Sequence, residues 1–453
     1  MLGDEVWQLL DDALGVYRDD PRATAWLRGF AARLDEPLRI AVAGPHRVGK
    51  TTLVGALIGE EFAGGDAFLW YRDGPRAHAH VGRHEVPVVR RDGRIAVEAT
   101  GAERIDVEWP SRSLRDLVLI DSPARASVER VYRDADAVLY LTRHMHSADL
   151  EQLRSAHDHP FARATPVDTV VVLARADEIG AGRIDALSSA RQVARRYRRE
   201  ASVIPLCQNV VAVSGLLAVA SRTLRDDEFT ALSTLARHSR VDLEDHLLSV
   251  DRFVSTDLPL DRSVRHALVE RFGIFGVRLT TTLVRQGCDT PVKLSAQLAQ
   301  RSGLGELRES IGLYFAERRD VLKARAALLG LDVVLRATPR PAAARLTAAM
   351  ERLVASAHDF RELRLLAALH AGRVRFSDEL DDEAVRLIGG TGTSMLARLA
   401  IEYEPTDGEL RHAVLDAVAR WREHAANPVL DNAQRRAAAV VVRSCEGMYA
   451  GLG

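Results

Sequence analysis

The chain has 453 residues, a formal net charge of −1 and 47% hydrophobic residues. This length exceeds what one hydrophobic core usually organises and predicts two or three domains. A net charge near zero gives no overall attraction to nucleic acid, and we expect no nucleic-acid partner.

The three cysteines, Cys207, Cys288 and Cys445, are scattered along the chain, which argues against a disulfide framework and favours a reducing compartment. The first residues lack the basic and apolar regions of a signal peptide. No apolar run approaches the ~20 residues that span a bilayer. These features predict a cytoplasmic protein.

Residues 4–34 carry apolar side chains at helical spacing, with a break at Pro21. A helix ahead of the first strand must pack on some other part of the protein. Residues 38–43 then form an apolar run that runs directly into a glycine-containing loop, and helical periodicity follows from Leu53 to Ile58. Strand, loop and helix in this order make the loop the most informative segment of the chain.

That loop has the pattern Gly-x-x-x-x-Gly-Lys-Thr, which is a P-loop. Its N–H groups and the helix N-terminus suit a polyphosphate, Lys50 can reach the β and γ oxygens, and Thr51 can hold Mg²⁺. The chain has only three lysines, and one stands where a compact point charge is needed. We therefore predict a nucleotide site with Mg²⁺, the alternative being a structural glycine turn. The predicted contact residues are Gly44, His46, Arg47, Val48, Gly49, Lys50, Thr51 and Thr52.

Further apolar runs alternate with helical patterns up to about residue 215. The runs cover residues 67–71, 117–120, 137–141, 169–173 and 209–213. This alternation predicts a mainly parallel, doubly wound α/β sheet. Beyond residue 216 we predict only helices, separated by breaks at prolines and glycines such as Pro259 and Gly273.

Two aspartates follow apolar runs, where ligands sit in open α/β sheets. Asp121 comes about 70 residues after the P-loop and is predicted to support the Mg²⁺ together with Thr51. Asp177 can accept both the N1–H and the exocyclic amine of guanine, and Arg175 can lie against the base. Ser214, after the last run, is a candidate base contact. The competing interpretation of Asp177 is a solvated loop residue that caps the next turn.

These motifs resemble the dynamin-like GTPases of actinobacteria, the group that contains the mycobacterial isoniazid-inducible proteins. The resemblance covers residues 37–285 and rests on three segments. They are Val107–Pro123, Ala135–Leu141 and Arg175–Arg183. It implies GTP or GDP as ligand and a helical bundle built from the N-terminal helix and the helices after the GTPase domain.

The resulting prediction is an α/β P-loop GTPase domain with an extended all-α bundle and stalk. Its units are an N-terminal helix (1–36), a GTPase domain (37–235) and a helical bundle and trunk (236–453). The resemblance implies a homo-oligomer, or a hetero-oligomer with a related dynamin-like protein, and peripheral contact with the inner face of the cell membrane. The leading hypothesis is slow or partner-dependent GTP hydrolysis, with Lys50, Thr51 and Asp121 as the catalytic residues.

The chain departs from this family where water would be positioned for attack. Residues 53–99 contain no serine or threonine to serve as the family's switch-I threonine. Ala124 replaces a glycine next to the γ-phosphate, and Ala174 and Arg175 replace an Asn/Thr-Lys pair. Two alternatives therefore stay open: a non-hydrolysing interaction subunit of an active partner, and an ATP-binding P-loop protein.

Overall fold

The computed structural model describes residues 2–91, 93–99, 101–156, 168–183, 185–370 and 372–452. Within these ranges the main sheet has nine strands in the order β11-β10-β9-β1-β8-β2-β7-β3-β4, and β5 pairs with β6 in a separate hairpin. The strands are β1 (Leu38–Ala43), β2 (Phe68–Asp73), β3 (His78–Val81), β4 (His84–Val86), β5 (Val88–Arg91), β6 (Arg94–Val97), β7 (Arg104–Trp109), β8 (Leu117–Asp121), β9 (Ala137–Thr142), β10 (Thr169–Ala174) and β11 (Asn209–Val213).

The five strands β8, β1, β9, β10 and β11 are parallel, which confirms the predicted α/β sheet. β2 runs antiparallel to β8, and β3 and β4 extend the sheet as a hairpin. The apolar pattern did not predict β3 to β7. Most residues of these strands are half-buried or exposed, and β4 and β5 have no buried residue, so the strands lack the continuous apolar runs of the central strands.

Helices cover both faces of the sheet, as a doubly wound fold requires. Leu53 of the first crossover helix packs with Ile40 in one core, whereas Ala190 packs with Val171 in a second core on the opposite face. The helices of this part are α3 (Lys50–Ile58), α4 (Val128–Asp134), α5 (Ser147–Ala156), α7 (Ala186–Tyr197) and α8 (Gly215–Thr223).

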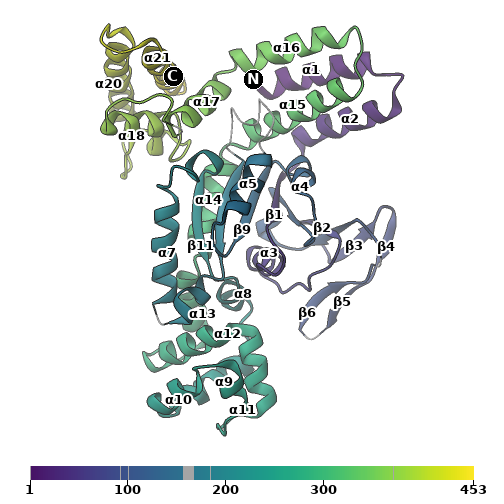
Figure 1. The fold of residues 1–453 in the computed structure, drawn as a ribbon, viewed down its shortest axis with the longest axis vertical. Coiled ribbons are helices and arrows are strands. Elements are labelled where there is room, and N and C mark those ends of the chain that lie inside the picture. Colours follow the sequence, from purple (N-terminus) through teal and green to yellow (C-terminus); the bar gives the residue numbers. More distant parts are fainter. Residues whose placement is uncertain are drawn as a thin grey trace.

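The next helices stay on the α/β part. Helices α9 to α13 lie beyond the end of the sheet where α3 and α8 begin, whereas α14 lies beside β11 (Figure 1). Leu232, Phe272 and Leu294 share one core with strand residues such as Val171. The predicted boundary at 235/236 falls inside α9. These helices are α9 (Asp226–Arg237), α10 (Arg240–His246), α11 (Val250–Ser255), α12 (Arg262–Arg285), α13 (Pro291–Ser302) and α14 (Leu304–Ile311).

The N-terminal helices join two later ones in a bundle at the opposite end of the molecule (Figure 1). Tyr17 is buried and donates a hydrogen bond to the carbonyl of Thr338 at 2.8 Å. The bundle contains α1 (Leu2–Val16), α2 (Pro21–Asp35), α15 (Arg319–Ala337) and α16 (Ala343–Ser356). This confirms the helical part of the predicted fold class and the break near Pro21.

The C-terminal helices surround a third core that contains the fully buried Trp421. They are α17 (His358–His370), α18 (Asp378–Leu387), α19 (Met395–Leu399), α20 (Asp407–Ala426) and α21 (Asn432–Ala450). In the described part of the chain, no helix combines the length and apolarity needed to cross a bilayer.

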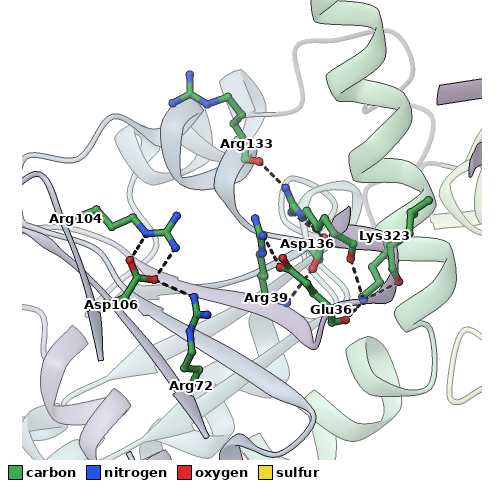
Figure 2. Close-up of polar contacts among 10 residues, drawn as sticks. Glu36, Arg39, Arg72, Arg104, Asp106, Arg133, Asp136 and Lys323 are labelled. Atoms are coloured by element: carbon green, nitrogen blue, oxygen red, sulfur yellow. Dashed lines mark hydrogen bonds and ion pairs between the residues drawn. The ribbon is translucent and has the colours of Figure 1, made fainter. Parts of the chain in front are cut away.

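A buried polar network fastens α2 to the sheet (Figure 2). Arg33 donates from Nε to Asp136 Oδ1 at 2.8 Å, and Asp136 Oδ2 accepts from the backbone N–H of Arg39 at 2.8 Å. Lys323 of α15 donates to the carbonyls of Arg33 and Leu34 at 3.1 and 3.0 Å, so it satisfies the C-terminal end of α2. This network fixes the bundle against the start of β1.

Candidate functional site

The loop between β1 and α3 has a backbone that glycine makes possible. Gly44 has φ 138°, and a Cβ there would lie 2.2 Å from the carbonyl oxygen of Leu141. Gly49 has φ 108° and forms the N-cap of α3. Arg47 also adopts a left-handed conformation, with φ 58°. The loop therefore curls at the N-terminus of α3, where backbone N–H groups and the helix dipole favour an anion.

Lys50 lies within this loop and is 8% exposed. Its Nζ donates to the carbonyls of Gly44 at 2.9 Å and Pro45 at 3.1 Å. Burial lowers the pKa of Lys50, and the nearby charge of Asp121 offsets part of that shift. Two neutral carbonyl acceptors hold the ammonium at the centre of the loop. A phosphate oxygen could take their place and would be a stronger acceptor, because it is charged.

Asp121 lies beside the P-loop because β8 is paired in parallel with β1, with Val42 opposite Asp121. Thr51 Oγ1 donates to Asp121 Oδ2 at 2.6 Å. Burial raises the pKa of Asp121 to about 6, against the hydrogen bond from Thr51 and the charge of Lys50. The second oxygen, Oδ1, is buried and has no hydrogen-bond partner among the described residues.

These two side chains fit a Mg²⁺ ion. The hydroxyl of Thr51 and the unpaired carboxylate oxygen of Asp121 are hard oxygen ligands, and Mg²⁺ typically combines such ligands with waters and substrate phosphates. A divalent cation would also favour the ionised form of Asp121. Within the described ranges no three His, Cys, Asp or Glu side chains form a metal group of their own.

A cavity of about 510 Å³ lies between the start of α3 and the ends of β10 and β11. Five of the predicted residues line it: Val48, Gly49, Thr52, Arg175 and Asp177. The sequence placed Ala174 in the base-reading element but did not predict it as a contact, and it did not predict the other lining residues, which are Leu53, Leu141, Val172, Glu178, Val213, Gly215 and Leu216. Most of those are ordinary core residues whose position only the folded sheet reveals.

Asp177 lies in the short 3₁₀ segment η2 (Ala176–Gly182) after β10 and is 6% exposed. Burial raises the pKa of Asp177, and a hydrogen bond with Ser214 lowers it. Ser214 is fully buried, and its Oγ accepts from the N–H of Leu217 at the start of α8. The predicted base contact Ser214 therefore orients Asp177.

Arg175 connects the two halves of the cavity. Its Nη2 donates to the carbonyl of Arg47 in the P-loop at 2.9 Å, and its Nη1 donates to Glu178 at 2.5 Å. Arg175 has φ 54°, so two arginines in left-handed conformations meet here. Such residues cost roughly 1–3 kcal/mol each and are typical of ligand-binding segments. The side chains of His46 and Arg47, which were predicted to contact phosphates, are exposed.

The segment after α3 passes close to Thr51. A Cβ on Gly64 would lie 3.3 Å from Thr51 Oγ1. A second cavity of about 720 Å³ adjoins this point, with Arg94 and Arg271 among its lining residues. Arg271 of α12 is tied to Glu228 at 2.7 Å and pairs with Glu61 of this segment. No serine or threonine hydroxyl therefore lies in the segment that passes Thr51, the predicted Mg²⁺ ligand.

Helix α12 also approaches the Asp177 side of the cavity, which the sequence did not indicate. It is kinked at Gly273, where φ is 67° and ψ is 167°. A Cβ on Gly273 would lie 3.4 Å from Leu216 and 3.9 Å from Asp177 Oδ2. Gly273 therefore interrupts the helix, as predicted, and its non-helical backbone joins the two helical halves of α12 beside Asp177.

The P-loop, the carboxylate at the end of β8 and the mixed α/β sheet define a P-loop protein with additional helical units. No family model matches the chain. The isoniazid-induced protein IniC from two strains of Mycobacterium tuberculosis is 40% identical over 484 residues, covering 99% of this chain and 98% of the relative. The chain belongs to the family of that protein, which confirms the predicted kinship with the mycobacterial isoniazid-inducible proteins.

Comparison with solved structures gives only distant likenesses. An oligomerised bacterial dynamin pair, described as a mechanism for long-range sensing and tethering of membranes, aligns with 100% of this chain and 74% of its own, at 11% identity and a TM-score of 0.32. The bacterial dynamin GTPase LeoA from ETEC aligns with 99% of this chain and 94% of its own, at 12% identity and a TM-score of 0.24. TM-scores this low support no statement about function.

Proposed function

We propose that this chain is a dynamin-like protein that binds guanine nucleotides with Mg²⁺. The observation that carries the proposal is the joint arrangement at one edge of the sheet. Lys50 and the curled loop suit a triphosphate, Thr51 and Asp121 suit the metal, and the adjoining cavity leads to the buried carboxylate of Asp177. The distribution of charge along the cavity matches a nucleotide from phosphate to base.

Guanine is favoured over adenine by the chemistry of Asp177. Its carboxylate accepts hydrogen bonds only, and guanine presents two N–H donors on one edge, whereas adenine presents an acceptor and a donor. A buried carboxylate left unpaired costs a desolvation penalty, so a base that satisfies both oxygens is selected. Arg175, which bridges to the P-loop, limits the position of the base between itself and Leu216.

A second candidate function is a nucleotide-binding subunit with little hydrolysis of its own. It is favoured by Gly64 beside Thr51, because this residue offers backbone groups but no side chain to orient water. Phosphoryl transfer depends on such positioning, and each tenfold loss in rate corresponds to about 1.4 kcal/mol of barrier. Assembly with a second copy or a related dynamin-like protein at the inner membrane surface would then supply the missing group.

Calorimetry tests the binding proposal. We expect GTP and GDP with Mg²⁺ to bind the wild-type protein, Lys50→Ala to weaken both, and ATP to compete poorly against a fluorescent GDP analogue. Lys293→Ala is the matched control. Lys293 lies on α13, is exposed and pairs with Asp289, outside the candidate site. Equal weak binding by wild type and Lys50→Ala would refute the proposal. Assays of GTP hydrolysis with and without lipid distinguish a protein that hydrolyses GTP from a subunit that only binds it.

A further inference from the structure

A second cleft lies outside the nucleotide site, between α2, α4 and the strands β1, β2 and β7. It has a volume of about 960 Å³ and is open to solvent; we name it the α2–α4 cleft. Its charged lining consists of five arginines and one aspartate. They are Arg33, Arg39, Arg104, Arg130, Arg133 and Asp134. Arginines therefore outnumber carboxylates in the lining itself, and Asp136, Glu36 and Asp106, which lie outside it, pair with Arg33, Arg39 and Arg104.

Each of these arginines has its guanidinium carbon over an aromatic ring, in a cation–π contact. Arg104 and Arg39 lie 3.7 and 5.1 Å from the ring centre of Trp70. The remaining three pairs are Arg130 with Phe68 at 4.6 Å, Arg133 with Trp26 at 5.5 Å and Arg33 with Phe30 at 5.7 Å. A cation–π contact helps to hold a guanidinium in place without consuming its N–H donors, so these donors can still bind an oxyanion.

The carboxylates around the cleft hold the arginines unequally. Arg33 is paired with the buried Asp136 at 2.7 Å and donates from Nη1 to the carbonyl of Arg133 at 3.0 Å. Asp106 is shared between Arg104 at 2.6 Å and Arg72 at 2.9 Å (Figure 2). These groups position the wall of the cleft.

The two arginines of α4 are held only loosely. Arg130 lies 3.3 Å from Glu103 and 3.7 Å from Asp134, and Arg133 lies 3.4 Å from Asp134. These separations exceed a good N–H···O distance. The side chains of Arg130 and Arg133 are 32% and 45% exposed. Several N–H donors of both residues are therefore available to a ligand, at positions that the aromatic rings fix.

We propose that the α2–α4 cleft binds a phosphate-bearing anion. A phosphate group offers three acceptor oxygens and up to two negative charges, which match paired guanidinium forks better than a single carboxylate does. The concave shape suits a compact group: the phosphate of a small soluble molecule or the headgroup of an anionic lipid. Because α2 belongs to the bundle and α4 to the α/β part, such a ligand would contact both.

The test compares two double variants that each remove two positive charges. Arg130→Gln/Arg133→Gln removes the loosely held pair, and Arg28→Gln/Arg115→Gln removes two exposed arginines that do not line the cleft. All proteins also carry Lys50→Ala, because inorganic pyrophosphate would suit the P-loop as well. Circular dichroism checks that each variant is folded. If Arg130→Gln/Arg133→Gln is unfolded, the single variant Arg133→Gln takes its place.

Calorimetry with inorganic pyrophosphate and co-sedimentation with vesicles of equal parts phosphatidylglycerol and phosphatidylcholine are the two arms. We expect the cleft variant to lose at least about tenfold in affinity in one arm, while the control variant keeps the parent's affinity. Loss in the pyrophosphate arm assigns a soluble ligand, and loss in the vesicle arm alone assigns a lipid headgroup. Binding in neither arm, or equal effects of both double variants, overturns the proposal. No nucleotide is used, so the outcome is independent of the P-loop site.

Discussion

The buried ion pair between Arg33 and Asp136 should dominate the attachment of α2 to the sheet. Their side chains are 4% and 0% exposed, and they are 2.7 Å apart at Nη2 and Oδ1. Asp136→Asn keeps the shape but leaves Arg33 as a buried cation without a countercharge. Breaking a buried pair from one side costs about 3–5 kcal/mol. Asp136 also accepts from the N–H of Arg39, which Asn can still do, so we expect the lower end, about 3 kcal/mol.

Urea unfolding followed by tryptophan fluorescence measures this loss as a lower transition midpoint. The matched control is Asp134→Asn, because Asp134 is 26% exposed and lies 3.4 to 3.7 Å from its arginines. Exposed pairs of this kind contribute less than about 1 kcal/mol. Adding Arg33→Met to Asp136→Asn should recover part of the loss, since it removes the unpaired charge. Equal shifts for Asp136→Asn and Asp134→Asn would refute the reasoning.

Two further predictions concern the P-loop and the C-terminal helices. Gly44→Ala places a Cβ against the carbonyl of Leu141 and should abolish nucleotide binding in calorimetry. Gly305→Ala is the control, because its added Cβ meets open space, and it should keep nucleotide binding. Equal binding by the two variants would contradict the loop geometry. Burial would raise the pKa of Glu362, but hydrogen bonding by His358 and the charge of Arg398 outweigh it and hold the pKa at about 2. A depressed carboxyl pKa stabilises the fold above its unfolded value of 4.5, and this contribution is lost as pH falls toward about 2. Glu362→Gln should therefore destabilise by up to about 3 kcal/mol at pH 7 and by little near pH 2, and a pH-independent difference in urea unfolding would contradict this.

The P-loop part of the candidate site could be predicted from sequence because its residues lie in one short segment. Chain order alone places Gly44, Gly49, Lys50 and Thr51 at one strand-to-helix turn. Asp121 followed from a simple rule, since the carboxyl ends of neighbouring parallel strands meet at one edge. The buried central strands were equally visible, as their apolar runs are continuous.

The remaining features depend on contacts between distant segments. Gly273 and Asp177 are 96 residues apart in the chain. Nothing in the sequence around Gly273 indicates that the kink of α12 brings this helix close to Asp177. The exposed strands β3 to β7 carry no apolar run to reveal them. Ser214 was expected to touch a base, and only the fold shows it buried behind Asp177. The arginines of the α2–α4 cleft come from four different elements, so no local sequence pattern indicates that they lie together.

Recognition of guanine by Asp177 is the central claim, and a change of one atom tests it most directly. Asp177→Asn replaces an acceptor by an N–H donor, which matches the carbonyl that xanthine carries in place of guanine's exocyclic amine. Calorimetry should show GTP affinity falling at least about tenfold in the variant, with xanthosine triphosphate bound better by the variant than by wild type. Unchanged GTP affinity in Asp177→Asn, with no gain for xanthosine triphosphate, would contradict the account.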